Sequence, residues 1–151
     1  MADNANGAAL VYTDGGCIGN PGPGGYAALI VIGTEEQVIK GRDPATTNNK
    51  MEMTAAIKAL EALPAGLPAV VHSDSQYVVK GMTEWLPGWK ARGWRTAQRK
   101  PVLNVELWQA LEAAVAQHAA VRWTWVRGHN GHALNEQADQ IASEDASQAR
   151  K

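Results

Sequence analysis

The sequence predicts an α/β fold: a single-domain, five-stranded mixed β-sheet whose first three strands are antiparallel and whose two faces carry helices. Three apolar runs near the N-terminus are separated by breaks that are short or rich in Pro and Gly, so they can pair as antiparallel neighbours. Further along, apolar runs alternate with segments of helical periodicity, and a strand reached through a helical crossover runs parallel to its neighbour. A length of 151 residues with 45% hydrophobic residues fits one domain with a well-buried core.

The first three strands are predicted over residues 8–13, 26–32 and 37–42. The run at 8–13 (AALVYT) is apolar and is followed by turn-forming residues, which is typical of a buried strand. A polar break at 33–36 separates the second and third runs and indicates a hairpin. Prolines and glycines interrupt residues 17–25, so this segment is expected to be a loop and neither a helix nor a central strand.

A change of apolar spacing at Met53 marks the first long helix. Met53 is followed by apolar residues at i+3, i+4 and i+7, which places one face of the helix against the core. The polar residues 46–49 supply candidate N-caps, and the Pro–Gly segment 64–66 ends the helix. A fourth strand, also short and buried, is predicted at 69–72, and a helix is expected from 75 to about 84.

The C-terminal part repeats this alternation of helix and strand. Residues 104–117 have helical spacing with Asn104 as the expected N-cap, and residues 121–125 alternate apolar and polar side chains like a half-exposed strand. A loop is expected at 128–133. The last predicted helix is defined by the apolar residues Leu134, Ala138 and Ile141.

Composition excludes several classes of protein. No apolar run approaches the roughly 20 residues of a membrane span, and residues 1–7 lack the basic start and apolar stretch of a secretory signal. The single cysteine, Cys17, excludes an internal disulfide framework and a multi-cysteine zinc site. We therefore expect a soluble cytoplasmic domain with flexible ends at residues 1–7 and 144–151.

Positive charge concentrates between residues 80 and 100. Six basic residues stand there against one acid, although the formal net charge of the whole chain is −1. Three of the six tryptophans, Trp85, Trp89 and Trp94, lie in the same segment. A basic, Trp-rich arm at 81–101 suits a polyanionic partner. The alternative is a satellite cluster in which the tryptophans pack against one another and the cations are solvated.

Four carboxylates stand where the predicted elements could gather them. Asp14 and Asp74 each follow a buried strand, and sites in open α/β sheets form at the carboxyl ends of strands. Glu52 lies near the start of the first long helix, and Asp139 lies on the last helix, beside its apolar stripe. Four carboxylates in one place repel one another unless cations are bound, and oxygen-only ligands suit Mg²⁺ or Mn²⁺. Taken singly, each acid is better interpreted as a helix cap or a solvated surface group, and only the four together favour a metal site.

Histidines and a glycine-rich segment allow more than one interpretation. His129 and His132 resemble a metal-ligand pair, but zinc needs further ligands, so His129 is either a proton-exchanging loop residue or merely exposed. His72, in a strand, and His118, at a helix end, are interpreted as structural. Residues 22–27 nominally fit a dinucleotide-binding fingerprint, but a strand follows where that fingerprint needs a helix. A tight turn, or a close approach of the backbone to a substrate, fits these glycines better.

Side-chain amides stand close to the predicted carboxylates. Asn48 and Asn49 precede Glu52, and Gln76 follows Asp74 by two residues. Such amides can bind base edges or a ribose 2′-hydroxyl and so distinguish RNA from DNA.

Five motifs in order, between about residues 10 and 142, together resemble ribonuclease H of the bacterial type I class. They are TDGGC at 13–17 with GNPGPGGY at 19–26, TTNNKME at 46–52, SDSQYV at 73–78, WVRGH at 125–129, and NE at 135–136 ahead of Asp139. The resemblance implies a ribonuclease H-like fold and endonucleolytic hydrolysis of the RNA strand of RNA–DNA hybrids. It also implies 5′-phosphate and 3′-hydroxyl ends and no dependence on base sequence.

The same resemblance assigns roles to individual residues. Asp14, Glu52, Asp74 and Asp139 are implied to hold two Mg²⁺ ions, with Mn²⁺ as the alternative metal, and His129 is implied to assist proton transfer or product departure. The implied nucleic-acid contacts are Cys17, Asn20, Asn48, Asn49 and Gln76 on the hybrid, Thr47 and Asn104 on a DNA phosphate, and Trp85, Trp89, Lys90, Trp94 and Arg95 in the arm.

One position departs from the family pattern. Ala45 stands two residues before Thr47, where relatives often place a basic residue, so we expect either a weaker phosphate pocket or substitution by Arg42. The sequence contains no signal for an obligate protein partner, and we expect a monomer.

Two rival functions are retained. A non-catalytic hybrid-binding or duplex-binding module would bind without cutting, but it leaves the four acids unexplained because carboxylates without cations repel phosphates. A general nuclease of the same fold acting on DNA is the second rival, and only its substrate distinguishes it.

Overall fold

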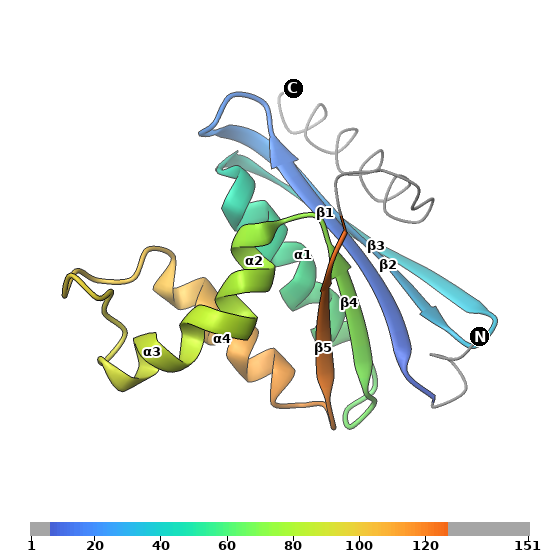
Figure 1. Cartoon of the computed structure of the whole chain (residues 1–151). Helices are drawn as coiled ribbons and strands as arrows, with labels where there is room; N and C mark the ends of the chain where they lie inside the picture. The colour runs from blue at the N-terminus through green and yellow to red at the C-terminus, as the bar shows by residue number, and fades with distance from the viewer. Residues whose placement is uncertain (1–6, 127–151) are drawn as a thin grey trace.

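The computed structural model describes residues 7–126 of the chain. Along the chain the elements are β1 (Ala9–Cys17), β2 (Gly22–Ile32), β3 (Glu35–Thr46), α1 (Asn48–Ala62), β4 (Ala69–Ser73), α2 (Gln76–Lys80), a π-helical turn η2 (Gly81–Trp85), α3 (Leu86–Ala91), α4 (Val105–Val115) and β5 (Val121–Trp125). The five strands form one sheet in the order β3-β2-β1-β4-β5 (Figure 1). β1, β2 and β3 pair antiparallel, whereas β4 is parallel to β1 and β5 is parallel to β4. The predicted mixed sheet is confirmed.

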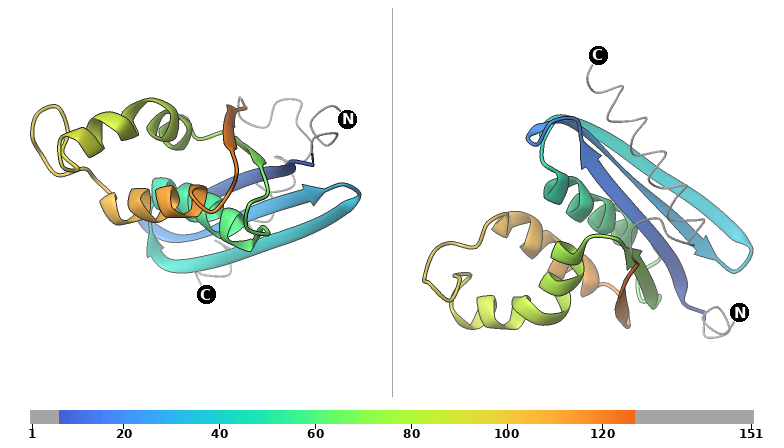
Figure 2. Two further views of the ribbon diagram at one scale, coloured as in Figure 1. Left: turned by 90° about the horizontal axis from the view of Figure 1, so that it is seen from below. Right: turned by 45° about the horizontal axis from the view of Figure 1, so that its top comes forward.

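The main core lies between one face of the sheet and the helices α1, α2 and α4. Val11, Ile30 and Val71 from three strands are buried in it together with Leu60 of α1 and Trp108 of α4. A smaller cluster of Tyr12, Ala27 and Leu29 lies on the opposite face of β1 and β2. Figure 2 shows, from two further directions, that the helices within residues 7–126 lie on one side of the sheet. The helix predicted around Leu134, Ala138 and Ile141, the loop at 128–133 and, apart from Gly7, the predicted flexible ends lie outside the described residues.

The glycine-rich segment 17–25 is shorter as a loop than the sequence predicts. β1 continues to Cys17 and β2 begins at Gly22, and Cys17 pairs with Gly24 across the two strands. A Cβ atom on Gly24 would lie 2.6 Å from the carbonyl oxygen of Gly16 and 2.5 Å from Thr46 Cγ2. The turn comprises only residues 18–21, so the predicted loop at 17–25 was wrong for the ends of β1 and β2. The physical reason is that Gly24 lacks a Cβ atom and therefore allows the strands to pack closely.

The first long helix begins and ends as predicted. The Thr47 hydroxyl caps α1 by accepting a hydrogen bond from the backbone N–H of Lys50 at 3.2 Å. The helix ends at Ala62, and Pro64 follows shortly after it. Its buried face packs across β1 and β2.

The helix predicted after β4 is longer and less regular than expected. Ser75 caps it through a 3.2 Å hydrogen bond from the Val78 N–H, but the helix continues beyond Glu84 through η2 into α3. The wide π turn begins at Gly81, where an added Cβ would lie 2.0 Å from Cη2 of Trp108. The ring of Trp108 therefore occupies the space that a side chain at this position would need.

Asn104 does not cap α4 in the predicted way. It occupies the N-cap position with a left-handed backbone (φ 59°), and its side chain makes no capping hydrogen bond. Its amide instead donates to the hydroxyl of Tyr77 at 3.2 Å. The segment between α3 and α4 projects away from the sheet (Figure 1). Within residues 7–126 no helix has the length and apolar character needed to cross a membrane.

Candidate active site

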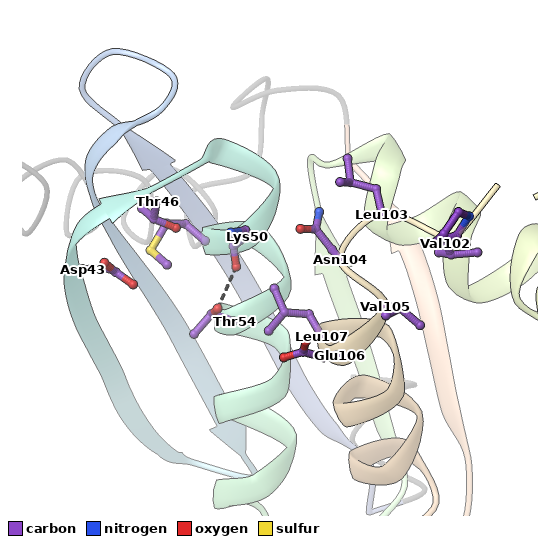
Figure 3. Close-up of a pocket in the computed structure, with 12 residues that line it drawn as sticks. Asp43, Thr46, Lys50, Thr54, Val102, Leu103, Asn104, Val105, Glu106 and Leu107 are labelled. Carbon is purple, nitrogen blue, oxygen red and sulfur yellow. Dashed lines mark hydrogen bonds between the residues drawn. The ribbon is translucent and has the colours of Figure 1, made fainter. Parts of the chain in front are cut away.

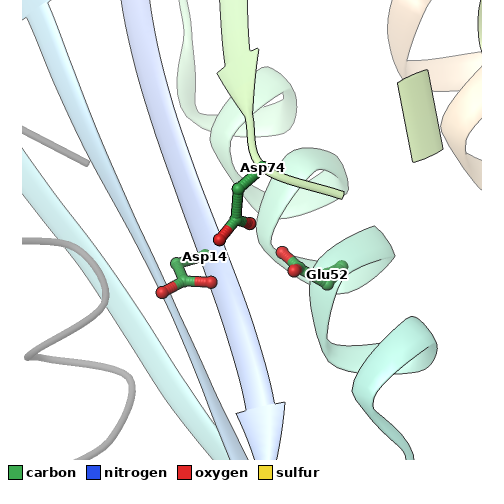
Figure 4. Close-up of side chains that lie close together, drawn as sticks. All are labelled: Asp14, Glu52 and Asp74. Carbon is green, nitrogen blue, oxygen red and sulfur yellow. The ribbon is translucent and has the colours of Figure 1, made fainter. Parts of the chain in front are cut away.

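Three of the predicted carboxylates meet at one place. Asp14 lies on β1, Asp74 directly follows β4, and Glu52 lies on the second turn of α1. One ligand oxygen from each residue lies within 4.8 Å of the other two (Figure 4). β1 and β4 are parallel neighbours, so the polar residues near their carboxyl ends are adjacent, and α1 packs over β1. The indole N–H of Trp125 donates to the backbone carbonyl of Asp74 at 3.3 Å and helps to hold this turn.

Burial and mutual repulsion make the cluster electrostatically strained in the absence of a cation. Asp14 is only 4% exposed. Burial raises the pKa of Glu52 well above its usual value, the charges of Asp14 and Asp74 raise it further, and a hydrogen bond with Asp74 acts in the same direction. The backbone N–H of Gly15 opposes this by hydrogen bonding to the Glu52 carboxylate. The carboxyl group of Glu52 therefore tends to hold a proton when no cation is bound.

The donor set fits a divalent cation. Glu52 Oε1 and Asp74 Oδ1 are buried, and neither has a hydrogen-bond donor within residues 7–126. A buried carboxylate oxygen without a partner is costly, and a bound cation removes that cost. Three hard oxygen ligands suit Mg²⁺ or Mn²⁺ better than zinc. The fourth predicted ligand, Asp139, and the predicted proton-exchanging His129 lie outside the described residues.

The predicted hybrid contacts near the N-terminus form one network. The backbone N–H of Cys17 donates to Asn48 Oδ1 at 2.9 Å, and the Asn48 N–H donates to Asn20 Oδ1 at 3.1 Å. Burial raises the pKa of the Cys17 thiol, so this thiol is not an activated nucleophile. Asn49 is half-buried on the first turn of α1, and Gln76 is exposed at the start of α2, two residues after Asp74.

A pocket of about 540 Å³ lies between the end of β3, the first turns of α1 and the start of α4 (Figure 3). Asn104, a predicted phosphate contact, lines it, whereas Thr47, the other predicted contact, is engaged as the cap of α1. Thr46 and Lys50 line the pocket and were missed at the sequence level. Thr46 Oγ1 is buried and has no hydrogen-bond partner among the described residues. Among the residues that the structure describes, Lys50 is the basic side chain that lines this pocket, and Arg42 does not line it.

The tryptophans of the arm divide into one outward residue and two packed ones. Trp85 is 36% exposed. Trp89 is half-buried between Trp85 and Trp108, with ring centroids 5.7 Å and 5.2 Å away. Trp94 is also half-buried and packs against the main core. Both interpretations of the arm therefore have structural support, because Trp89 and Trp94 attach the arm to the body while Trp85 faces outward.

Three cations of the arm have their charged groups bonded to other parts of the protein. Lys90 forms an ion pair with Glu112 of α4. Arg92 Nε donates to the carbonyl of Arg95 at 3.1 Å, and Arg95 Nη1 donates to the carbonyl of Arg99 at 3.2 Å. These three arginines line one surface cavity, which concentrates positive charge at the end of the arm.

Comparison with known proteins identifies the family. The RNase H family model matches residues 6–147. A ribonuclease H of Herminiimonas arsenicoxydans is 58% identical over 133 residues, covering 88% of this chain and 90% of that protein. A ribonuclease HI of Caulobacter vibrioides is 55% identical over 139 residues, covering 92% of this chain and 93% of that protein. LC9-RNase H1, a type 1 RNase H with the type 2 active-site motif, matches with a TM-score of 0.84 and 36% identity, covering 94% of this chain and 73% of that one. The chain therefore belongs to the ribonuclease H family and is a metal-dependent nuclease.

Proposed function

We propose that this protein hydrolyses the RNA strand of RNA–DNA hybrids, using two divalent cations held by Asp14, Glu52, Asp74 and Asp139. The observation that carries this proposal is that Asp14, Glu52 and Asp74 bring one oxygen each within 4.8 Å of one another. Glu52 Oε1 and Asp74 Oδ1 are buried there without a hydrogen-bond donor among the described residues. The similarity to curated ribonucleases H supports the choice of substrate. The products are a 5′-phosphate and a 3′-hydroxyl end.

The side chains of the protein have distinct tasks in this proposal. When bound, the cations supply charge stabilisation for the attacking and departing oxygens of the phosphodiester. The carboxylates fix the place of the reaction, and His129 exchanges a proton near neutral pH. The network of Cys17, Asn20 and Asn48, extended by Asn49 and Gln76, contacts ribose 2′-hydroxyls on the RNA strand.

The DNA strand is held at two places. The pocket lined by Asn104 and Lys50, next to Thr47, takes a DNA phosphate, and the arm contacts the same strand through Trp85 and Arg95. Because these contacts are to sugar and phosphate, cleavage is independent of base sequence. We further propose that Mg²⁺ is the metal in use and that the protein acts as a monomeric, single-domain enzyme of the cytoplasm.

Three matched duplexes test the proposal. The full chain is incubated with an RNA–DNA hybrid, a duplex RNA and a duplex DNA of one sequence, each with Mg²⁺ or with EDTA. We expect cutting only of the RNA strand of the hybrid and only with Mg²⁺. Equal cutting of the DNA duplex would establish a general nuclease instead, and binding without cutting would establish a binding module.

A further inference from the structure

Gly15, which follows Asp14 on β1, lies against the backbone of α1. A Cβ atom built on Gly15 would lie 2.4 Å from the carbonyl carbon of Met51, 2.7 Å from its oxygen and 2.6 Å from the backbone nitrogen of Glu52. All three atoms belong to the peptide group that leads into Glu52. They are backbone atoms, so no change of rotamer can make room for a side chain at this position.

The backbone of Gly15 also contacts the neighbouring carboxylate. Its N–H donates to Asp14 Oδ1 at 2.9 Å. Gly15 therefore holds Asp14 through its amide, and it can lie against the peptide group before Glu52 because it has no side chain. These contacts do not depend on a bound cation.

We propose that Gly15 is a positioning residue, which sets the separation of α1 from β1 so that Glu52 and Asp14 lie within reach of one cation. The inference rests on the proposed function, because it assumes that these carboxylates hold the metal. The ordinary contact distance for a Cβ atom begins near 3.4 Å, whereas the distance at Gly15 would be 2.4 Å. A methyl group here therefore moves α1 away from β1 by about 1 Å, a misplacement that can cost about 100-fold in rate at a reacting centre.

The neighbouring glycine provides a matched control. Gly16 lies next along β1, and a Cβ atom on it would meet only Asn48 Oδ1, at an ordinary 3.7 Å. Gly81 provides a second control, because a Cβ there would lie 2.0 Å from Trp108 Cη2, a ring of the main core that is not part of the carboxylate cluster. G16A tests the loss of a glycine in this strand, and G81A tests destabilisation as such.

The experiment measures Mg²⁺ binding without substrate. The full chain and the variants G15A, G16A and G81A are titrated with MgCl₂ while the thermal unfolding midpoint is recorded, since a ligand of the native state raises that midpoint. All samples contain trimethylamine N-oxide, which strengthens burial and keeps destabilised variants folded. Hybrid affinity in EDTA, kcat and KM are measured in parallel on the same samples.

We expect G15A to need about tenfold or more Mg²⁺ for half-maximal stabilisation. Its kcat should fall by about 10- to 100-fold. Its affinity for the hybrid in EDTA should change by less than about threefold, because the nucleic-acid contacts are intact. G16A and G81A keep the Mg²⁺ midpoint of the unaltered chain. An unchanged midpoint in G15A would overturn the proposal. The proposal would also be overturned if G15A stays unfolded under conditions in which G81A folds. That result would show that the close approach of Gly15 to α1 is needed for folding as a whole and does not act specifically on the carboxylates.

The unaltered chain separates this inference from the proposed function. If it neither binds Mg²⁺ nor cuts the hybrid, the proposed function fails. If it does both and G15A behaves like G16A, only the role of Gly15 fails.

Discussion

At the scale of single residues, the site depends on acids that are adjacent in space and distant in sequence. Asp74 contributes a ligand oxygen and has a buried oxygen, Oδ1, without a hydrogen-bond donor in the described part of the chain. An amide at this position keeps the shape of the side chain but removes its charge. The effect of that change on cleavage and on binding therefore separates catalysis from recognition.

We expect Asp74→Asn to reduce cleavage with Mg²⁺ by about 1000-fold or more, because several kcal/mol of charge stabilisation at the reacting phosphate is lost. Binding of the hybrid remains measurable, since the amide network and the arm are intact. Single-turnover cleavage and a binding titration on the same preparation check both parts. Full cleavage by this variant would remove Asp74 from the metal site.

The raised pKa of Glu52 makes a prediction about stability without metal. In the folded protein the pKa of Glu52 lies well above the value of 4.5 expected for an unfolded chain, so the folded state holds the proton more tightly. This contribution to stability is complete below about pH 4.5 and is lost as the pH rises through the folded pKa. Glu52→Gln does not ionise, and in EDTA it should become more stable than the unaltered chain as the pH rises.

Denaturant unfolding of both proteins in EDTA between pH 4 and pH 8 checks this sign. Added Mg²⁺ should reverse the order at high pH, because it stabilises only the chain that keeps the carboxylate. If the stability difference is independent of pH, Glu52 is not buried among charges as described.

The sequence predicted the gathering of Asp14, Glu52 and Asp74 because strand ends and helix starts can be located from local patterns. It could not reveal the contact of Gly15 with α1, which depends on the packing of two elements. Lys50 was missed at the pocket proposed to take a phosphate for the same reason, although it stands three residues after Thr47, about one helical turn away. Asn104 was assigned as a cap from its residue type, but its left-handed backbone directs its amide to Tyr77.

At the scale of elements, the π turn η2 connects the body to the arm. Gly81 begins this turn, and the fully buried Trp108 fills the space beside it. Trp85, at the end of η2, is the most exposed of the three tryptophans of the arm. The arm therefore begins at this turn and carries its exposed ring at the end of the turn.

Gly81→Ala should destabilise the protein by about 2–3 kcal/mol, since overpacking a core is costly and the added methyl group would meet the fully buried ring of Trp108. Urea unfolding monitored by tryptophan fluorescence measures the change. A neutral or stabilising effect, as expected for Gly→Ala in an ordinary helix, would show that the ring of Trp108 is not held against this turn.

The elements themselves were predictable from apolar periodicity, whereas some of their ends were not. Residues 17–25 are rich in Gly and Pro, which ordinarily indicates a loop, yet Gly24 is needed where β1, β2 and Thr46 pack closely. Likewise, nothing in the local sequence GMTEW at 81–85 marks a π turn, and the close packing of Gly81 against Trp108 involves a residue more than twenty positions later.

At the scale of the whole molecule, an acidic body carries a basic arm. The formal net charge is −1, yet the arginines at the end of the arm line one cavity. One cation of the arm is neutralised within the protein, because Lys90 pairs with Glu112 on α4. The carboxylate of Glu112 therefore competes with nucleic-acid phosphates for Lys90.

Glu112→Gln frees Lys90 to contact a nucleic-acid phosphate, so hybrid binding should become tighter. The slope of log K against log salt concentration should become steeper by about 0.9, the value for one additional phosphate contact on duplex DNA. Folding stability should change by no more than about 1 kcal/mol, since the pair is partly exposed. Binding titrations at several KCl concentrations measure the slope. An unchanged slope would show that Lys90 does not contact the nucleic acid.

The most direct test of the account is to locate the metal. Crystals of the full chain soaked in Mn²⁺ give an anomalous diffraction signal at each bound ion. The account predicts a peak coordinated by carboxylate oxygens of Asp14, Glu52 and Asp74. No peak between these residues at saturating Mn²⁺, or peaks only elsewhere on the surface, would contradict it.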